Sequence, residues 1–232
     1  PEPGFRGVVL ANELLDAMPV HIFQKSGSGV LEQYVLEHDG AFASQWRSAS
    51  PVLQSAVDEI ESRYGELDAG YTSEVNLRLK PWMKELQAVL QQGVMLLVDY
   101  GYTGPAYYHP ERHMGTLICH YQHRAHADPL ILAGLQDITA SVDFSAVARA
   151  GADAGLRPAG YTTQANFLLG CGLDQMLGQL DPQHAEYIDI LQGVKQITLP
   201  SEMGERFQAI ALTRDLDISL MGFAFRDLIS RL

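Results

Sequence analysis

The sequence predicts an α/β protein built on a largely parallel sheet. Short runs of apolar and β-branched residues at Arg6–Ala11 and Val94–Asp99 are typical of strands that are covered on both faces. Segments with helical spacing separate these runs, and a last apolar strand is expected at Phe207–Thr213. Strands that alternate with helices and end in a final strand indicate an α/β layout.

Composition narrows the functional classes. The chain has 232 residues, 16 Lys and Arg against 28 Asp and Glu, and a net charge of −12. That acidic balance argues against a nucleic-acid binder or a membrane-surface protein. No uncharged apolar run of roughly 18 residues is present, so we expect no membrane insertion. The two cysteines, Cys119 and Cys171, form no CxxC motif, which favours a reducing compartment.

The first residues indicate a chain cut from a larger protein. The sequence begins at Pro1 rather than at Met, without a signal peptide, and enters an apparent buried strand within a few residues. An antiparallel ribbon is then expected, since Val20–Gln24 and Val30–Glu37 flank the turn Ser26–Gly29. A third strand at Ala41–Trp46 completes this ribbon.

Helices are expected on both sides of the second buried strand. Ser50 and Pro51 open the first of them, with Pro at its first position. Ser73–Gln92 is predicted as a second helix, either bent or started at Pro81, that Gly93 ends. Tyr100–His113 is expected to be a loop, and Thr116–Tyr121 a short strand.

The last third of the chain alternates in the same way. Asp137–Val142 is expected to be extended, and Asp143 to cap the helix Phe144–Ala154. Arg157–Thr162 is predicted as a strand. Three later segments are expected to be helical: Thr163–Leu180, Pro182–Gln192 and Leu216–Leu232.

The first candidate site follows the first strand. Asn12 and Glu13 would emerge at the carboxyl end of that strand, where open α/β sheets bind ligands. A helical turn would bring Asp16 to the same side as Glu13, and the two carboxylates could hold a cation such as a guanidinium. An ordinary helix N-terminus, with acidic residues complementing the dipole, explains the same residues.

A second candidate occupies the equivalent position one strand along. Asp99 and Tyr100 follow the run Val94–Val98. Asp99 could fix a substrate, or it could hold the loop as a turn-forming aspartate beside Gly101. Two acidic strand ends side by side favour a functional site.

Polar loops supply further candidates. Asp137, Thr139, Ser141 and Asp143 alternate with apolar residues, which places four polar groups on one face of an extended segment or, alternatively, on an edge strand that ends in a cap. Glu205, just before the last strand, could contact substrate or only support its loop.

The histidines between the second and third strands lack a metal-ligand spacing. His120, His123 and His126 form no HExxH pattern and have no cysteine close in sequence. We expect no metal there, and a polar loop that closes over a ligand instead. The sequence also lacks a GxGxxG or Walker A loop and a GxSxG elbow.

Five segments, in order, resemble the MidA family of S-adenosylmethionine-dependent methyltransferases, which includes the mitochondrial arginine methyltransferase that assists assembly of respiratory complex I. They cover most of the chain: ANELLDAMPVHIFQK (Ala11–Lys25), VDYGYTG (Val98–Gly104), HRAHADPL, GLQDITASVDFS and MGERFQAIAL.

The resemblance implies a partial class I methyltransferase fold, a Rossmann-like doubly wound sheet with an antiparallel last strand and an inserted β-ribbon. The first strand of this chain would be the fourth of that template, Met95–Val98 the fifth, Arg157–Thr162 the sixth and Phe207–Thr213 the seventh. The glycine-rich cofactor loop and the acidic ribose-binding residue of such proteins are absent. Residues 1–232 are therefore expected to form a single domain, the C-terminal part of a methyltransferase domain without its cofactor-loop half.

The implied function is methyl transfer from S-adenosylmethionine to a protein arginine. Glu13, Asp16 and Asp99 would be catalytic, with the carboxylates holding the guanidinium, which stays protonated in water. Ala11, Asn12 and Glu13 would contact the cofactor. Substrate contacts are expected from Tyr100, His126, Asp137, Thr139, Asp143 and Glu205.

Two rival functions remain open on these residues. One is a non-catalytic assembly factor that holds a partner in the same cleft, and the other is a small-molecule methyltransferase. The expected partner is a protein substrate, such as a respiratory complex subunit, and a homodimer is expected through the exposed edge of the first strand. The expected location is the cytoplasm for a bacterial protein and the mitochondrial matrix for a eukaryotic one.

Overall fold

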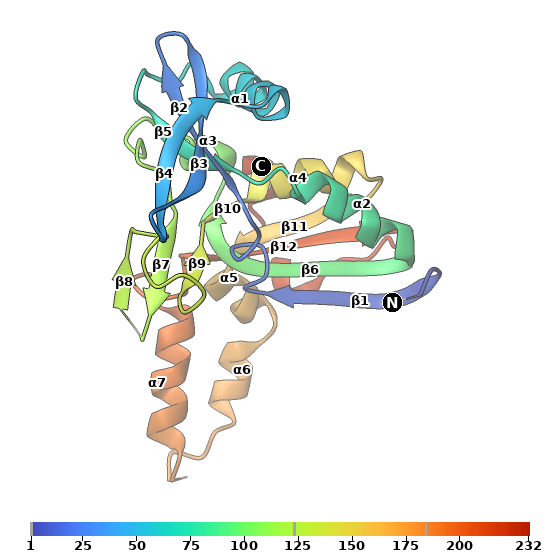
Figure 1. The fold of residues 1–232 in the computed structure, drawn as a ribbon. Coiled ribbons are helices and arrows are strands. Elements are labelled where there is room, and N and C mark those ends of the chain that lie inside the picture. The colour runs from blue at the N-terminus through green and yellow to red at the C-terminus, as the bar shows by residue number, and fades with distance from the viewer. Residues whose placement is uncertain (1, 123, 184) are drawn as a thin grey trace. The chain divides into compact units, whose positions relative to one another are not determined.

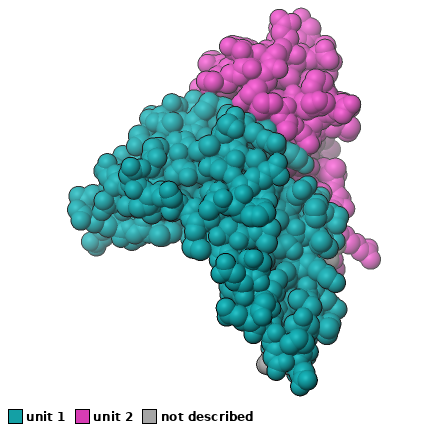
Figure 2. All heavy atoms as spheres, turned by 180° about the vertical axis from the view of Figure 1, so that it is seen from behind, with its two compact units in different colours: residues 1–14, 80–103, 143–232 teal, residues 15–79, 104–142 magenta. Residues whose placement is uncertain are grey.

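The computed structural model describes residues 2–122, 124–183 and 185–232 (Figure 1). Contacts divide the chain into two compact units, which Figure 2 shows in different colours. The first unit comprises residues 1–14, 80–103 and 143–232, and the second comprises residues 15–79 and 104–142. The assignment of residues 1–232 to a single domain stays a prediction.

The first unit is built on the predicted sheet. Its strands lie in the order β1 (Phe5–Asn12), β6 (Leu90–Tyr102), β12 (Phe207–Arg214) and β11 (Arg157–Thr163). β1 is parallel to β6, and β12 is antiparallel to both of its neighbours. This is the order fourth, fifth, seventh and sixth of the methyltransferase template, so the expected fold class is confirmed.

Helices cover both faces of this sheet (Figure 1). Helix α4 (Phe144–Asp153) packs so closely that a Cβ on Gly151 would lie 2.8 Å from the Leu212 side chain. On the other face, α5 (Gln164–Gly170) and the C-terminal segment bring Phe167 and Phe223 against Ala209 and Ala211 of β12. The central strands are thereby buried on both faces.

The second unit contains the predicted ribbon. β2 (His21–Ser26), β3 (Gly29–His38) and β4 (Ala41–Ser48) form antiparallel pairs, and β5 (Thr72–Val75) joins β2 from the other side. Helix α1 (Pro51–Tyr64) begins as predicted, because the Ser50 side chain accepts the Leu53 amide and Pro51 needs no partner at its position.

The rest of the second unit is a small sheet and a loop. Strands β8 (Arg124–His126), β7 (Ile118–Tyr121) and β9 (Asp137–Thr139) lie in that order, after a short helix α3 (Gly104–Tyr107). The aromatic core of this unit includes a stacked pair, Tyr64 and Tyr108, with ring centroids 5.7 Å apart.

The predicted helix Ser73–Gln92 is wrong at both ends. Residues Thr72–Val75 pair with His21–Gln24 as β5, and only Leu79–Val89 forms a helix, α2. At the other end, Leu90 already pairs with Phe5 in the main sheet. Long-range strand pairing overrides local helical spacing at both places.

The later helices are shifted or broken relative to the prediction. The expected helix Thr163–Leu180 splits into α5 and α6 (Leu173–Gly178), because Gly172 takes a left-handed conformation with φ of 87°. The expected helix Pro182–Gln192 begins later, as α7 (Tyr187–Thr198).

The expected C-terminal helix Leu216–Leu232 is also wrong. Only two short 3₁₀ turns form, η1 (Met221–Phe223) and η2 (Ile229–Arg231). The segment still docks on the sheet, since the Phe223 ring fills the space above Gly160 and stacks edge-on against Phe167 at 5.3 Å. Packing of one aromatic side chain, rather than a helical stripe, fixes this segment.

β1 differs from the fully buried strand that its apolar run indicates. Val8 is 63% and Leu10 67% exposed, so the face of β1 that carries them is uncovered among the described residues. β1 also pairs only with β6 among the described strands. Within the described residues, no helix is long and apolar enough to cross a membrane.

Candidate functional site

Polar residues line the carboxyl edge of the main sheet. Asn12 is paired with Val98 in the parallel register of β1 and β6, so Glu13 and Asp99 are the next residues on each strand. Asp99 is paired in turn with Gln208 of β12, and Gln208 with Thr163 of β11. One row of polar residues therefore crosses the sheet at the edge where α/β proteins bind ligands.

Glu13 occupies a strained position in this row. Its φ of 49° lies in the left-handed region, which costs energy for any residue with a Cβ. Its amide donates to the Val98 carbonyl at 3.0 Å, and its Oε1 accepts the Asn12 side-chain amide at 3.2 Å. Both side chains are exposed, so they remain accessible at the end of β1.

No helix starts after β1, which corrects two expectations for this segment. Residues 13–18 form bends and a turn, in which the Met18 amide donates to the Leu15 carbonyl. Glu13 therefore does not cap a helix, and the helical turn predicted to align it with Asp16 does not form. Asp16 itself belongs to the second unit and is buried, so the pairing of these two carboxylates stays a prediction.

Asp99 is almost completely buried at the end of β6. It is 1% exposed, and its Oδ1 accepts the Tyr100 amide at 2.9 Å. The ring of Tyr100 packs edge-on against Phe207 with centroids 5.6 Å apart. Asp99 thus orders the backbone at the strand end, the loop-holding role that the sequence also allowed.

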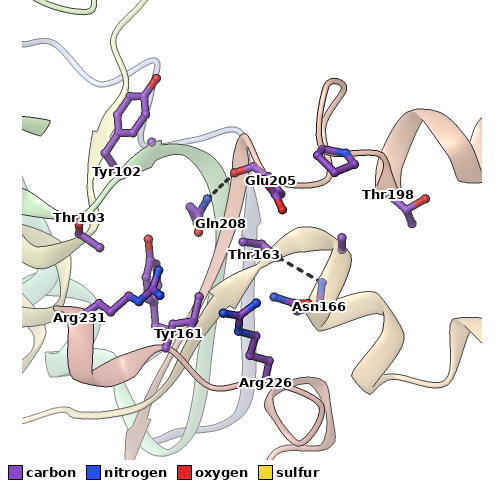
Figure 3. Close-up of a pocket in the computed structure, with 14 residues that line it drawn as sticks. Tyr102, Thr103, Tyr161, Thr163, Asn166, Thr198, Glu205, Gln208, Arg226 and Arg231 are labelled. Atoms are coloured by element: carbon purple, nitrogen blue, oxygen red, sulfur yellow. Dashed lines mark hydrogen bonds between the residues drawn. The ribbon is translucent and has the colours of Figure 1, made fainter. Parts of the chain in front are cut away.

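A cavity of about 420 Å³ opens at the same edge, between the ends of β6 and β11 and the C-terminal segment (Figure 3). Its lining is mainly polar and carries two arginines and one glutamate. The lining residues are Gly101, Tyr102, Thr103, Tyr161, Thr163, Ala165, Asn166, Thr198, Pro200, Glu205, Gln208, Arg226, Leu228 and Arg231.

Glu205 is the one candidate substrate contact from the sequence that lines this cavity. Its carbonyl accepts the Gln208 side-chain amide at 2.8 Å, as Figure 3 shows. Its carboxylate is exposed and carries no hydrogen bond among the described residues. Glu205 can therefore contribute a negative charge to whatever enters the cavity.

Tyr161 forms a neutral wall of the cavity. Burial raises the pKa of its hydroxyl, Asp143 raises that pKa further, and Arg231 lowers it. The hydroxyl therefore stays protonated at neutral pH and can donate a hydrogen bond.

Asp143 has a structural role beside this wall. Its Oδ1 accepts the Ala146 amide at 3.0 Å and caps α4, as predicted, while its Oδ2 lies 3.7 Å from Arg149. Burial raises the pKa of this carboxyl. A contact of Asp143 with substrate stays a prediction.

The remaining candidates lie in the second unit. Asp137 is paired with His120, and the Thr139 hydroxyl donates to the Ile118 carbonyl at 3.4 Å. The strand predicted to carry them breaks at Ala140 and Ser141, so Asp143 follows in a separate strand, β10 (Val142–Asp143).

His126 is paired with the buried Cys119, and its Nδ1 accepts the Asp128 amide at 3.3 Å. His123, the third histidine of the sequence cluster, lies outside the described residues. In the described ranges, no three His, Cys, Asp or Glu side chains converge as metal ligands do. A metal-free loop stays a prediction.

Comparison with known proteins shows the family. Residues 1–162 match a family described as "Putative S-adenosyl-L-methionine-dependent methyltransferase", and the chain belongs to that family. A crystal structure of a COG1565 superfamily member from Burkholderia thailandensis bound to S-adenosyl-homocysteine superposes with a TM-score of 0.92 at 40% identity. That match covers 100% of this chain and 59% of the other.

Curated relatives match over a similar stretch. The human protein arginine methyltransferase NDUFAF7, mitochondrial, is 32% identical over 88% of this chain and 44% of its own length. The Drosophila melanogaster homologue is 29% identical over 88% of this chain and 46% of its length. The chain thus spans about half the length of the curated relatives that it matches.

Several cavity residues had no signal in the sequence. Arg226 and Arg231 lie in a segment interpreted as a docking helix, and Thr163 and Gln208 come together only through antiparallel pairing. The candidate residues were found because they follow apolar runs at the carboxyl ends of strands. Gln208 instead lies near the amino end of β12, which reaches this edge because β12 is antiparallel to β6. The resemblance implied an antiparallel last strand, and the register of β12 on β6, which the sequence does not report, places Gln208 beside Asp99.

Proposed function

We propose that this chain is the substrate-side part of an S-adenosylmethionine-dependent methyltransferase that modifies arginine in a protein. It supplies the fourth to seventh strands of the template together with the inserted ribbon and loops. The observation that carries the proposal is the accessible Asn12–Glu13 pair at the carboxyl edge, with Glu13 in a strained backbone. Strain of this kind concentrates at functional sites.

The polar edge fits hydrogen bonding to a cofactor. Asn12 and Glu13 are exposed at the end of β1 and present both a donor and carboxylate acceptors, while the backbone of Ala11 leads to them. S-adenosylmethionine supplies the methyl group when it is bound. We propose that the remaining cofactor contacts come from sequence upstream of this chain, because relatives are about twice as long.

The carboxylates of this edge fit a guanidinium acceptor. A guanidinium keeps its proton in water, so a carboxylate such as Glu13 holds it and directs its electron density to the attacking nitrogen. The nitrogen–methyl bond forms as the sulfur–methyl bond breaks, and the proton leaves the nitrogen for a carboxylate or water. Most of the rate comes from positioning.

The names of the relatives support a proposal for the partner and the compartment. Their names describe protein arginine methyltransferases of mitochondria. We propose a protein substrate, with a respiratory complex subunit as the first to test. For a eukaryotic source the location is the mitochondrial matrix, and for a bacterial source it is the cytoplasm. For the 232-residue chain by itself we also propose a homodimer through β1, because the outer edge of β1 is open among the described strands.

Methyl transfer by the longer protein, extended upstream to the length of its relatives, tests this function. The longer protein should transfer labelled methyl groups from S-adenosylmethionine to arginine, and Glu13→Gln should lower the rate by at least about 100-fold. The matched control Glu66→Gln removes an exposed carboxylate and should leave the rate unchanged. Normal transfer by Glu13→Gln, at unchanged thermal stability, would remove Glu13 from the site.

A further inference from the structure

The cavity at the carboxyl edge of the main sheet is lined by more positive than negative side chains, although the protein as a whole is acidic. The chain carries a net charge of −12, yet two of the three charged residues that line this cavity are arginines, Arg226 and Arg231. Glu205 is the third. A concentration of positive charge against the overall balance is a feature that composition does not explain.

The two arginines are held by a well-anchored segment. The Leu228 amide donates to the Tyr161 carbonyl at 2.6 Å, and Asp227 Oδ1 accepts the amides of Tyr161 and Ile229 at 3.1 and 2.9 Å. The two bonds to Tyr161 attach the segment to β11 at Asp227 and Leu228, and the bond from Ile229 orders the turn within the segment. The guanidinium groups are therefore presented from a fixed backbone, which lowers the entropy cost of binding.

The guanidinium groups are available for a ligand. Among the described residues, neither has a hydrogen bond or an ion pair, and both side chains are exposed. Figure 3 shows the Arg226 guanidinium pointing toward Thr163 and Asn166, with Arg231 beside Tyr161. Asp227, the nearest carboxylate in sequence, accepts two backbone amides through its Oδ1.

Neutral donors complete the recognition of an anion. The Asn166 side chain lines the cavity, and the Tyr161 hydroxyl stays protonated for the reason given above. An arginine fork and neutral donors around one space match the two oxygens of a carboxylate. The same surroundings repel a guanidinium, so the methyl-accepting arginine does not belong in this cavity.

We propose that this cavity binds the carboxylate of an acidic side chain of the protein substrate, beside the arginine that is methylated. The proposal rests on the proposed function for the identity of its ligand. A volume of about 420 Å³ accommodates one side chain with its flanking backbone. The substrate class is therefore a protein segment that carries Asp or Glu near the target arginine.

Peptide binding to the 232-residue chain tests the proposal without cofactor. The probes are the peptide acetyl-Gly-Glu-Gly-amide and its neutral counterpart acetyl-Gly-Gln-Gly-amide, titrated against nitrogen-15-labelled protein. The Glu peptide should shift the side-chain amide signals of Asn166 and Gln208 to saturation. The Gln peptide should leave both signals in place, because a neutral amide forms no ion pair with the arginines.

Three variants locate the binding. Arg226→Gln with Arg231→Gln should weaken the Glu peptide by at least about tenfold. Glu205→Gln should tighten it, since this change removes a carboxylate that lines the cavity and repels the ligand. Arg6→Gln removes one positive charge, as each single arginine variant does, from the start of β1, at the opposite end of that strand from the carboxyl edge, and should leave affinity unchanged.

Four results would overturn the proposal. They are equal binding of the Gln peptide, unchanged binding by the double variant, an equal loss in Arg6→Gln, and weaker binding by Glu205→Gln. Tighter binding of inorganic phosphate than of the Glu peptide would reassign the cavity to a phosphate ligand.

If the double variant does not fold, the two single variants and Glu205→Gln still decide between these outcomes. Peptide binding needs no methyl transfer, so failure here leaves the proposed activity untouched, and the reverse also holds.

Discussion

Glu74 fixes the loop after α3 to strand β5 through its carboxylate. Glu74 is only 3% exposed. Its carboxylate accepts hydrogen bonds from the amides of Thr116 and Leu117 at 2.9 to 3.1 Å. It also accepts from the hydroxyls of Thr116 and Tyr107 at 3.1 and 3.3 Å. A Cβ on Gly115 would lie 2.2 Å from Oε1, so the loop approaches closely because this residue is Gly. Burial of the charge opposes these bonds and raises the pKa of Glu74.

Replacing Glu74 by Gln should destabilise the chain by about 1–3 kcal/mol, because the amide cannot accept from all of these donors. The difference should also depend on pH. A raised pKa means that the folded protein binds the proton more tightly, so this group stabilises most below its ordinary value of 4.5. That stability is lost as pH rises through the higher folded value.

Urea unfolding between about pH 4 and pH 7 measures this effect. The gap in unfolding free energy between the unaltered chain and Glu74→Gln should shrink as pH increases. Glu66→Gln, at an exposed position, should give a gap near zero throughout. A gap that grows with pH would show that the hydrogen bonds outweigh burial at Glu74.

Local signals predicted single residues well where the partner is close in sequence. Ser50 and Asp143 cap their helices as expected, because the capped amide lies three residues away. Glu74 gave no such signal, since its donors lie about forty residues further along the chain. Its burial follows from tertiary structure, which spacing along the sequence does not report.

At the scale of elements, the C-terminal segment depends on one aromatic anchor. Phe223 is 6% exposed and packs against Phe167 and Gly160, whereas Phe225 in the same segment is 63% exposed. Phe223→Ala should therefore cost about 3–5 kcal/mol, the usual loss for a buried ring. Phe225→Ala should stay within about 0.5 kcal/mol.

Urea unfolding of the two variants compares the same chemical change at a buried and an exposed site. If both variants lose stability equally, the segment does not dock through Phe223. If neither variant loses stability, docking of the C-terminal segment does not stabilise the folded state. The inference that this segment holds Arg226 and Arg231 in fixed positions would then be wrong.

The open edge of strand β1 leads to a second prediction at the scale of elements. Its outer edge is unpaired among the described strands, and Val8 and Leu10 are more than 60% exposed, so we expect the chain to self-associate there. Val8→Lys should shift the chain toward monomer. Val52→Lys, at a site on α1 that is 65% exposed, should not.

Light scattering over a concentration series distinguishes these cases. The unaltered chain and Val52→Lys should grow in mass with concentration, and Val8→Lys should grow less. A strictly monomeric chain would mean that the open edge is tolerated.

Elements were predictable where one short segment determines its own form. The ribbon turn, α1 and α4 follow from glycines, a proline and caps, and these predictions are confirmed. Thr72–Val75 and Leu90–Gln92 were predicted as helix because their spacing fits one. Their conformation comes from pairing with β2 and β1, which lie far earlier in the chain.

For the whole molecule, the sheet order and the family identify the fold more securely than any single motif does. The order β1, β6, β12, β11 with β12 antiparallel matches the resemblance strand by strand. The cavity with Arg226 and Arg231 was not predictable, because its lining comes from four separate segments of the chain. Its lining belongs to the edge on which ligands of α/β proteins bind.

The central claim is that this chain is the substrate-side part of a methyltransferase whose cofactor loops lie upstream. Calorimetric titration with S-adenosylhomocysteine tests it most directly, on the 232-residue chain and on the protein extended upstream to the length of its relatives. The account predicts micromolar binding by the extended protein and weak or no binding by the chain alone, because the glycine-rich loop contacts the cofactor most closely. Micromolar binding by the chain alone, or no binding by the extended protein, would contradict it.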